Sequence, residues 1–173
     1  GTDARRGVPY TWLPNHLGDA LEQVSPRSFL QAVRGAALET EDRYPDSRHA
    51  LHFEAIKAGV QRASQIRVEE IQEDYPWVRQ AMEPLRGLLI PCDPSDLLSA
   101  WESFGLIDRL QRARDADPWT PQPMWLEVGL QGLLADLERL GLLARMLNGR
   151  YNMPDVYRVG FGLLRRGGVK PVR

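Results

Sequence analysis

The sequence predicts an all-α protein with one small β-hairpin. Apolar residues recur three to five positions apart in the longest predicted helix, and a helical spacing continues through most of the chain, which is the period of an α-helix and not of a strand. The period changes once, around Asn148-Gly149, and Asn-Gly between apolar runs is a strong short-range signal for a hairpin. We therefore expect helices throughout, interrupted by a single pair of short strands.

Composition narrows the class of protein. The chain has 173 residues, of which 43% are hydrophobic and 26% charged, and this balance is typical of a folded globular chain. The formal net charge of -1 argues against the strongly basic footprint of a dedicated nucleic-acid-binding domain. Cys92 is the single cysteine, so no intrachain disulfide can form. With no long apolar run and no secretory signal, we expect a cytoplasmic protein that does not enter a membrane.

The first two thirds of the chain should form successive helices. Ser25-Pro26 is a helix start, because serine caps the first turn and proline suits the first helical position. This helix should end before Pro45, and a longer one should follow from about Ser47 to Glu73. Within the longer helix, Gly59 is expected to be a weak point that costs about 1 kcal/mol relative to alanine. Further helices are expected to start at Pro76, Pro94 and Leu106.

The segment 117–123 holds three prolines and is the best internal boundary. It divides a helical domain, 1–116, from a second unit, 117–173, that ends in a basic tail. In the second unit an amphipathic helix from Met124 to Leu140 should run into the hairpin, whose turn should be of type I′. An isolated hairpin is marginal in water, so it should pack on that helix through an apolar side that we assign to Leu143 and to either Met146 or Leu147. A helix followed directly by such a hairpin makes this unit winged-helix-like, and the fold a helical bundle followed by a winged-helix-like unit.

Three parts of the chain resemble the region after the nucleotide-binding core in bacterial P-loop ATPases of the AAA+/STAND kind. They are Arg6-Gly7-Val8-Pro9-Tyr10-Thr11-Trp12-Leu13, Ser25-Pro26-Arg27-Ser28-Phe29-Leu30, and a C-terminal set of Leu137, Leu140-Gly141, Gly149-Arg150-Tyr151 and Pro154-Asp155. In these ATPases a helical lid follows the core and a winged helix often follows the lid. The resemblance thus implies a lid-like domain over 1–116. It also implies that Arg27 is a nucleotide-sensing arginine, whereas the residues alone describe an exposed arginine at a helix start.

The chain departs from those ATPases in one important respect. It has no Gly-x-x-x-x-Gly-Lys-[Ser/Thr] loop, so nothing in it can cradle phosphates. We therefore expect a non-catalytic regulatory or interaction module, the C-terminal part of a larger bacterial ATPase, with no cofactor of its own and with ATP only if a nucleotide-binding core is joined to it. The alternative is a DNA-binding winged-helix regulator. Acidic residues on its groove helix, namely Glu127, Asp136 and Glu138, count against that alternative.

No set of residues predicts catalysis or a metal site. His49 and His52 lie three residues apart, but two further zinc ligands are missing, so a surface or half-buried histidine pair is the better interpretation. Cys92 has no histidine nearby in the sequence to act as a base, and we interpret it as a buried structural cysteine.

Cations gather towards the C-terminus. We expect them to contact nucleic-acid phosphates or a protein partner, to pair with the acidic stretch 69–74, or to form a solvated end of the chain. Trp119, in the proline-rich segment, is expected to be an exposed anchor for a protein partner. The cations are Arg145, Arg150, Arg158, Arg165, Arg166, Lys170 and Arg173.

Overall fold

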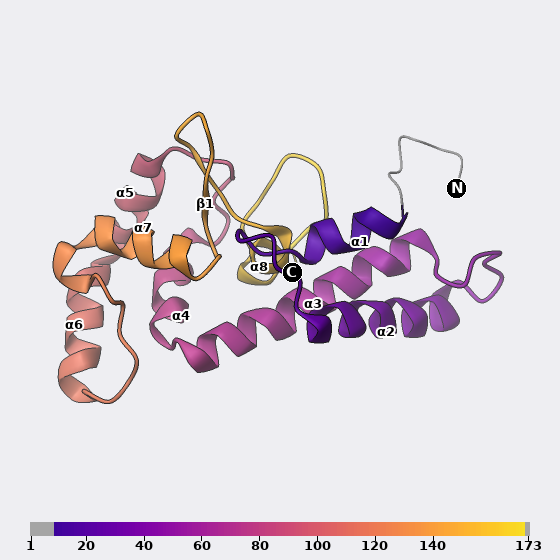
Figure 1. Cartoon of the computed structure of the whole chain (residues 1–173), viewed down its shortest axis with the longest axis horizontal. Coiled ribbons are helices and arrows are strands. Elements are labelled where there is room, and N and C mark those ends of the chain that lie inside the picture. Colours follow the sequence, from indigo (N-terminus) through magenta and orange to yellow (C-terminus); the bar gives the residue numbers. More distant parts are fainter. Residues whose placement is uncertain (1–8, 172–173) are drawn as a thin grey trace.

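The computed structural model describes residues 9–171. Over this range the chain is mostly helical, with one two-stranded antiparallel sheet, so the predicted fold class of an all-α protein with a small hairpin is confirmed. Helices α1 to α3 lie at one end of the elongated molecule, α5 to α7 lie at the other, and α8 lies between them (Figure 1). The elements are α1 (Pro9–Leu17), α2 (Pro26–Arg43), α3 (Phe53–Asp74), α4 (Trp77–Met82), η2 (Glu83–Leu85), α5 (Pro94–Phe104), α6 (Leu106–Ala116), η3 (Leu126–Val128), α7 (Leu130–Arg139), β1 (Ala144–Arg145), β2 (Tyr151–Asn152) and α8 (Asp155–Phe161).

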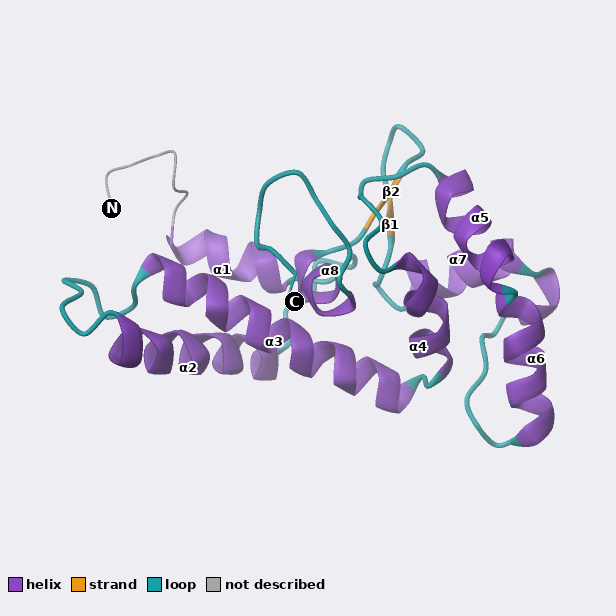
Figure 2. Ribbon diagram, turned by 180° about the vertical axis from the view of Figure 1, so that it is seen from behind, coloured by secondary structure: helices purple, strands orange, loops and turns teal. Residues whose placement is uncertain are grey.

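Helices α2 and α3 form a long antiparallel pair (Figure 2). As predicted, Ser25 caps α2, because its hydroxyl accepts a hydrogen bond from the Ser28 amide at 3.4 Å. Helix α3 begins at Phe53, so the predicted start near Ser47 is wrong. The true start depends on His52, whose ring accepts a hydrogen bond from the Glu54 amide at 3.3 Å.

Gly59 is required at the crossing of these two helices. A Cβ at this position would lie 2.2 Å from the Ala32 carbonyl oxygen and 3.1 Å from the Ala36 amide nitrogen. The expectation that Gly59 weakens α3 considered only the helix in isolation. In the folded chain the missing side chain lets the α2 backbone approach α3 closely.

One hydrophobic core runs through the molecule. Its buried members extend from Leu17 to Val169 and include residues on both sides of the proline-rich segment. Trp101 is fully buried in it and donates its indole hydrogen to the Ala81 carbonyl at 2.7 Å. The core thus continues across 117–123, and the division of the chain there stays a prediction.

The predicted helix from Met124 to Leu140 is interrupted. A short η3 turn precedes Gly129, whose φ of 74° breaks the helical path, and α7 starts only after it. The break is held by Asp136, whose carboxylate accepts a hydrogen bond from the Trp125 amide at 2.9 Å. A continuous helix is wrong here because this contact folds the segment back onto α7. Helix α7 is followed by a glycine, Gly141, whose positive φ of 73° is the left-handed conformation common just after helix ends.

The hairpin occurs where Asn148-Gly149 predicts it. Ala144 pairs with Asn152 and Arg145 with Tyr151. The turn is not of type I′, because Gly149 has a φ of 83° but Asn148 does not have a positive φ. The geometry is that of a three-residue loop with a glycine bulge, and the Gly149 amide bonds the Met146 carbonyl at 2.9 Å.

A third extended segment joins the hairpin to the rest of the fold. Cys92 and Tyr151 exchange backbone hydrogen bonds at 3.0 and 2.8 Å. Leu143 is buried as expected, but Met146 and Leu147 are exposed at the tip, so their assignment to the apolar side is wrong. Tyr151 and Met153 supply that side instead.

Candidate functional site

Arg27 lies in the first turn of α2 with its side chain 69% exposed. Its guanidinium forms an ion pair with Glu70 of α3, with 2.9 Å between Nη1 and Oε1. Arg67 approaches the other carboxylate oxygen of Glu70 at 3.3 Å. Two arginines therefore share one carboxylate at the start of α2. The predicted sensing role of Arg27 stays a prediction, and any phosphate that bound Arg27 would replace Glu70.

The same cluster reaches α8. The Arg67 guanidinium lies over the ring of Tyr157, 5.7 Å from its centroid, and Tyr157 is fully buried. Burial raises the pKa of Tyr157, while the nearby Arg67 charge opposes this effect. The contacts link the exposed start of α2 to the interior helix α8.

Arg158, predicted to face a ligand, is instead an internal residue. It is 0% exposed, and its Nε donates to Asp155 Oδ1 at 2.7 Å. Its other two nitrogens donate to the carbonyls of Leu163 and Val169. A phosphate or protein partner outside the molecule cannot reach this guanidinium, so its assignment as a contact residue is corrected.

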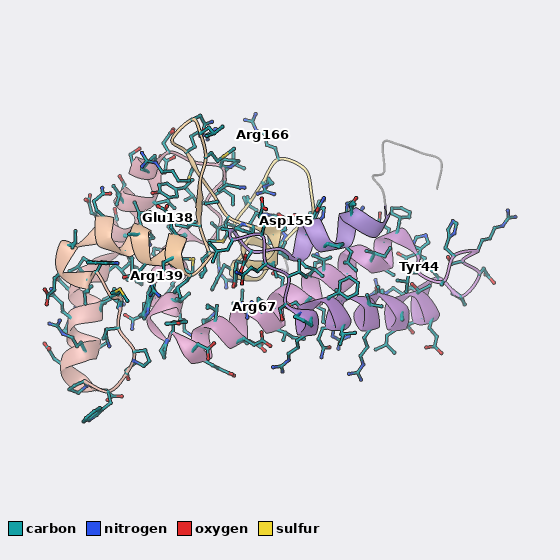
Figure 3. All side chains as sticks on the ribbon, in the orientation of Figure 1. Tyr44, Arg67, Glu138, Arg139, Asp155 and Arg166 are labelled. Carbon is teal, nitrogen blue, oxygen red and sulfur yellow. The ribbon has the colours of Figure 1, made fainter. Side chains whose placement is uncertain are left out.

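Asp155 is the centre of a buried ionic cluster (Figure 3). Besides Arg158, it binds Arg165 Nη1 at 3.0 Å, and His16 Nε2 of α1 lies 3.5 Å from its second oxygen. His16 is oriented by its Nδ1, which lies 2.7 Å from the Trp12 carbonyl oxygen. The cluster ties α1, α8 and the C-terminal segment together, and nothing in the local sequence pattern predicts it.

The remaining predicted cations differ in exposure. The Arg150 guanidinium donates a hydrogen bond to the Pro91 carbonyl, and its Nε lies 3.7 Å from Asp93 Oδ1, so part of it is already bound within the chain. Arg145, Arg166 and Lys170 are exposed, and Arg166 extends from the C-terminal loop (Figure 3). Arg173 lies outside the described residues.

The acidic stretch 69–74 does not pair with the C-terminal cations in the described part of the chain. Its ion pairs there involve Glu70 alone, and they run to Arg27 and Arg67. Asp155 takes the role expected of these acids, since it pairs with Arg158 at 2.7 Å and with Arg165 at 3.0 Å.

Two acids of the expected groove helix are not outward-facing charges. Asp136 is fully buried, and its carboxylate accepts a hydrogen bond from the Trp125 amide. Arg139 Nη2 lies 3.5 Å from Asp136 Oδ1. Glu138 accepts a hydrogen bond from the Tyr151 hydroxyl at 2.5 Å. Burial and this acidic neighbour raise the pKa of Tyr151 to about 12. The acidity attributed to the outer face of this helix was therefore overestimated.

Cys92 is buried, which agrees with its interpretation as a structural residue. Burial, together with Asp96 and Asp93, raises the pKa of its thiol to about 11, so the thiol is protonated near neutral pH. His52 serves as the cap of α3 and stacks on Tyr44. Among residues 9–171, no group of three or more His, Cys, Asp or Glu is placed to hold a metal ion.

Trp119 is 94% exposed, at a turn made by Asp117. The Trp119 amide donates to Asp117 Oδ1 at 3.1 Å, and the Thr120 hydroxyl donates to Oδ2 at 2.5 Å. The predicted anchor is thus on the surface, and its role stays a prediction.

The chain matches no family model, no curated protein and no solved structure in comparisons with each. Within residues 9–171, none of the helices is both long enough and apolar enough to cross a membrane.

Proposed function

We propose that this chain is a non-catalytic regulatory and interaction module, the lid and winged-helix portion of a larger bacterial ATPase of the AAA+/STAND kind. The observation that carries the proposal is the position of Arg27. It lies in the first turn of an 18-residue helix, exposed, and held by a carboxylate that a phosphate can replace. A planar guanidinium so placed can make two charge-assisted hydrogen bonds to a γ-phosphate offered by a neighbouring core.

The second unit supports the winged-helix part of the proposal. Helix α7 leads directly into the hairpin, and the pairing of Cys92 with Tyr151 adds a third extended segment beside it. The exposed tip, 146–149, would then be the wing.

Reading the parent gene tests the proposal first. We expect the reading frame upstream of this chain to encode a phosphate-binding loop, and the chain purified alone to show no ATP hydrolysis. An upstream frame without such a loop would contradict the ATPase assignment.

The role of Arg27 is tested in the parent ATPase. Arg27→Ala should slow ATP hydrolysis by about 10²-fold, because an electrostatic contact to the transferred phosphoryl group is lost. Arg27→Lys keeps the charge but loses the bidentate geometry, so its rate of ATP hydrolysis should lie between that of the wild type and that of Arg27→Ala. Glu70→Gln is the matched control, since it frees Arg27 and should not slow hydrolysis. ATP hydrolysis by Arg27→Ala at the wild-type rate would contradict a nucleotide-sensing role for Arg27.

Duplex DNA binding is the alternative proposal, and one observation favours it. Three acids on the expected groove helix argued against DNA binding. Asp136 is buried and Glu138 accepts a hydrogen bond from Tyr151, so Glu127 is the one that is exposed. A gel shift with mixed duplexes at about 50 mM salt tests it. Binding that weakens steeply with salt and that falls in Arg145→Ser would promote this alternative.

A further inference from the structure

The segment 115–138, which runs from the last turn of α6 into the last turn of α7, combines exposed apolar side chains with a lack of basic residues. No Lys, Arg or His occurs between Asp115 and Glu138. Four large apolar side chains of this segment are exposed to solvent, three of them within residues 124–128 and the fourth in the turn that precedes them, and we call this set the tryptophan face. They are Trp119, Met124, Trp125 and Val128.

The backbone that carries Met124, Trp125 and Val128 is fixed by contacts with α7. The buried Asp136 carboxylate accepts the Trp125 amide, and the Val128 amide donates to the Trp125 carbonyl at 2.9 Å. The same carbonyl lies so close to Gly132 that a Cβ there would be 2.1 Å from its oxygen. A carboxylate is costly to bury, and here it serves to fix this turn. Met124, Trp125 and Val128 are therefore displayed by a pre-organised support.

Trp119 is displayed by a separate polar turn. Its amide and the Thr120 hydroxyl both donate to the exposed Asp117 carboxylate. These hydrogen bonds, that of Thr120 first, lower the pKa of Asp117, so the carboxylate beside Trp119 stays ionised at neutral pH. The second tryptophan, Trp125, is followed directly by another exposed carboxylate, Glu127.

We propose that the tryptophan face docks a polypeptide segment that combines apolar anchors with Lys or Arg. Tryptophan and methionine are enriched in the cores of protein interfaces, and a fixed support lowers the entropy lost on binding. The Asp117 and Glu127 carboxylates belong to a sequence segment without Lys, Arg or His, and they complement a basic rim on the partner. This inference goes beyond the proposed function and does not depend on an ATPase core.

The same charges argue against two other occupants. Exposed tryptophans can stack on unpaired bases, but nucleic-acid sites combine such rings with cations that track the phosphates. Anionic lipid surfaces likewise attract Lys and Arg, which this region lacks. Carboxylates at these positions repel both.

Two labelled peptides with the same leucine and tryptophan pattern test the proposal on the full chain. One peptide carries lysine at its polar positions and the other carries glutamate. By fluorescence anisotropy, we expect the lysine peptide to bind at least about 10-fold more tightly than the glutamate peptide, and to weaken with added salt. Trp119→Ser and Val128→Ser should each weaken the lysine peptide by about 10-fold, and Glu127→Lys should weaken it as well. Leu147→Ser, at the exposed hairpin tip, is the matched control and should bind as the wild type does.

Several results would overturn the proposal. Equal binding of both peptides, no binding of the lysine peptide at about 1 mM, or an equal loss in Leu147→Ser would each do so. Binding of single-stranded DNA or of phosphatidylserine vesicles that is lost in Trp119→Ser would assign the face to those occupants. Self-association in sedimentation that is lost in the same variant would assign it to a second copy. Circular dichroism and thermal unfolding of each variant separate loss of the face from loss of the fold.

Discussion

Replacement of Arg158 by methionine distinguishes an arginine that holds the fold from one that meets a ligand. Methionine keeps a long side chain in place but removes the charge and all guanidinium donors. The change leaves the carbonyls of Leu163 and Val169 without their buried donor. It also takes from Asp155 its shorter ion pair, at 2.7 Å, and leaves the pair with Arg165 at 3.0 Å.

The expected loss of stability is large. Removal of one partner from a buried ion pair costs about 3 to 5 kcal/mol, because the other charge stays buried. Arg165 still compensates Asp155, so we expect a value near the lower end, about 3 kcal/mol. For a chain of this length that corresponds to a melting temperature lower by about 6 to 12 °C.

Urea and thermal unfolding, followed by circular dichroism, measure this loss. Arg166→Met is the control, because Arg166 is exposed and its removal should change the free energy of unfolding by no more than about 0.5 kcal/mol. Arg158→Lys is informative if the methionine variant is too unstable to purify, since lysine keeps the charge but cannot reach three acceptors at once. A melting temperature for Arg158→Met within about 2 °C of wild type would refute the internal role.

Four further predictions concern stability and reactivity. Gly59→Ala should lower the free energy of unfolding by about 1 kcal/mol or more, because the alanine Cβ would lie 2.2 Å from the Ala32 carbonyl oxygen. This clash should outweigh the better helix propensity of alanine. A variant that is more stable than wild type in urea unfolding would contradict the prediction. Folding raises the pKa of Cys92 to about 11 and that of Tyr151 to about 12, so the unfolded chain loses these protons at lower pH than the folded chain does. The urea concentration at the unfolding midpoint should therefore fall as pH rises from 9 to 11. A midpoint that stays constant over this range would contradict the prediction. For the same reason an alkylating reagent at pH 8 should modify Cys92 only as fast as the chain opens, which a rate equal to that of the urea-unfolded chain would disprove. Gly149→Ala should cost about 1 kcal/mol, because alanine is strained at a φ of 83°, and an unchanged melting temperature would argue against the bulged turn.

Local features could be predicted from the sequence because their causes lie within a few residues. Ser25 caps α2 because its hydroxyl bonds an amide three residues later. Gly141 follows α7 because glycine tolerates the left-handed backbone there. The hairpin position follows from Asn148-Gly149, although the turn type does not, since the bulge depends on how the two strands meet.

Boundaries set by distant residues could not be predicted in this way. The start of α3 depends on His52, whose amide bonds the Thr40 side chain across a loop. The break at Gly129 depends on Asp136, which lies a further two turns along the chain. Neither contact leaves a periodic pattern, because each involves a single polar side chain brought back onto the backbone.

The same distinction applies to the candidate sites. From the sequence alone, Arg158 and Arg166 are equivalent members of a basic region. Composition, helix period, caps and the absence of a phosphate loop are determined by the sequence, because each is a property of neighbouring residues. Exposure and charge pairing are decided only by the tertiary structure, because packing brings Asp155 to one arginine and leaves the other in solvent.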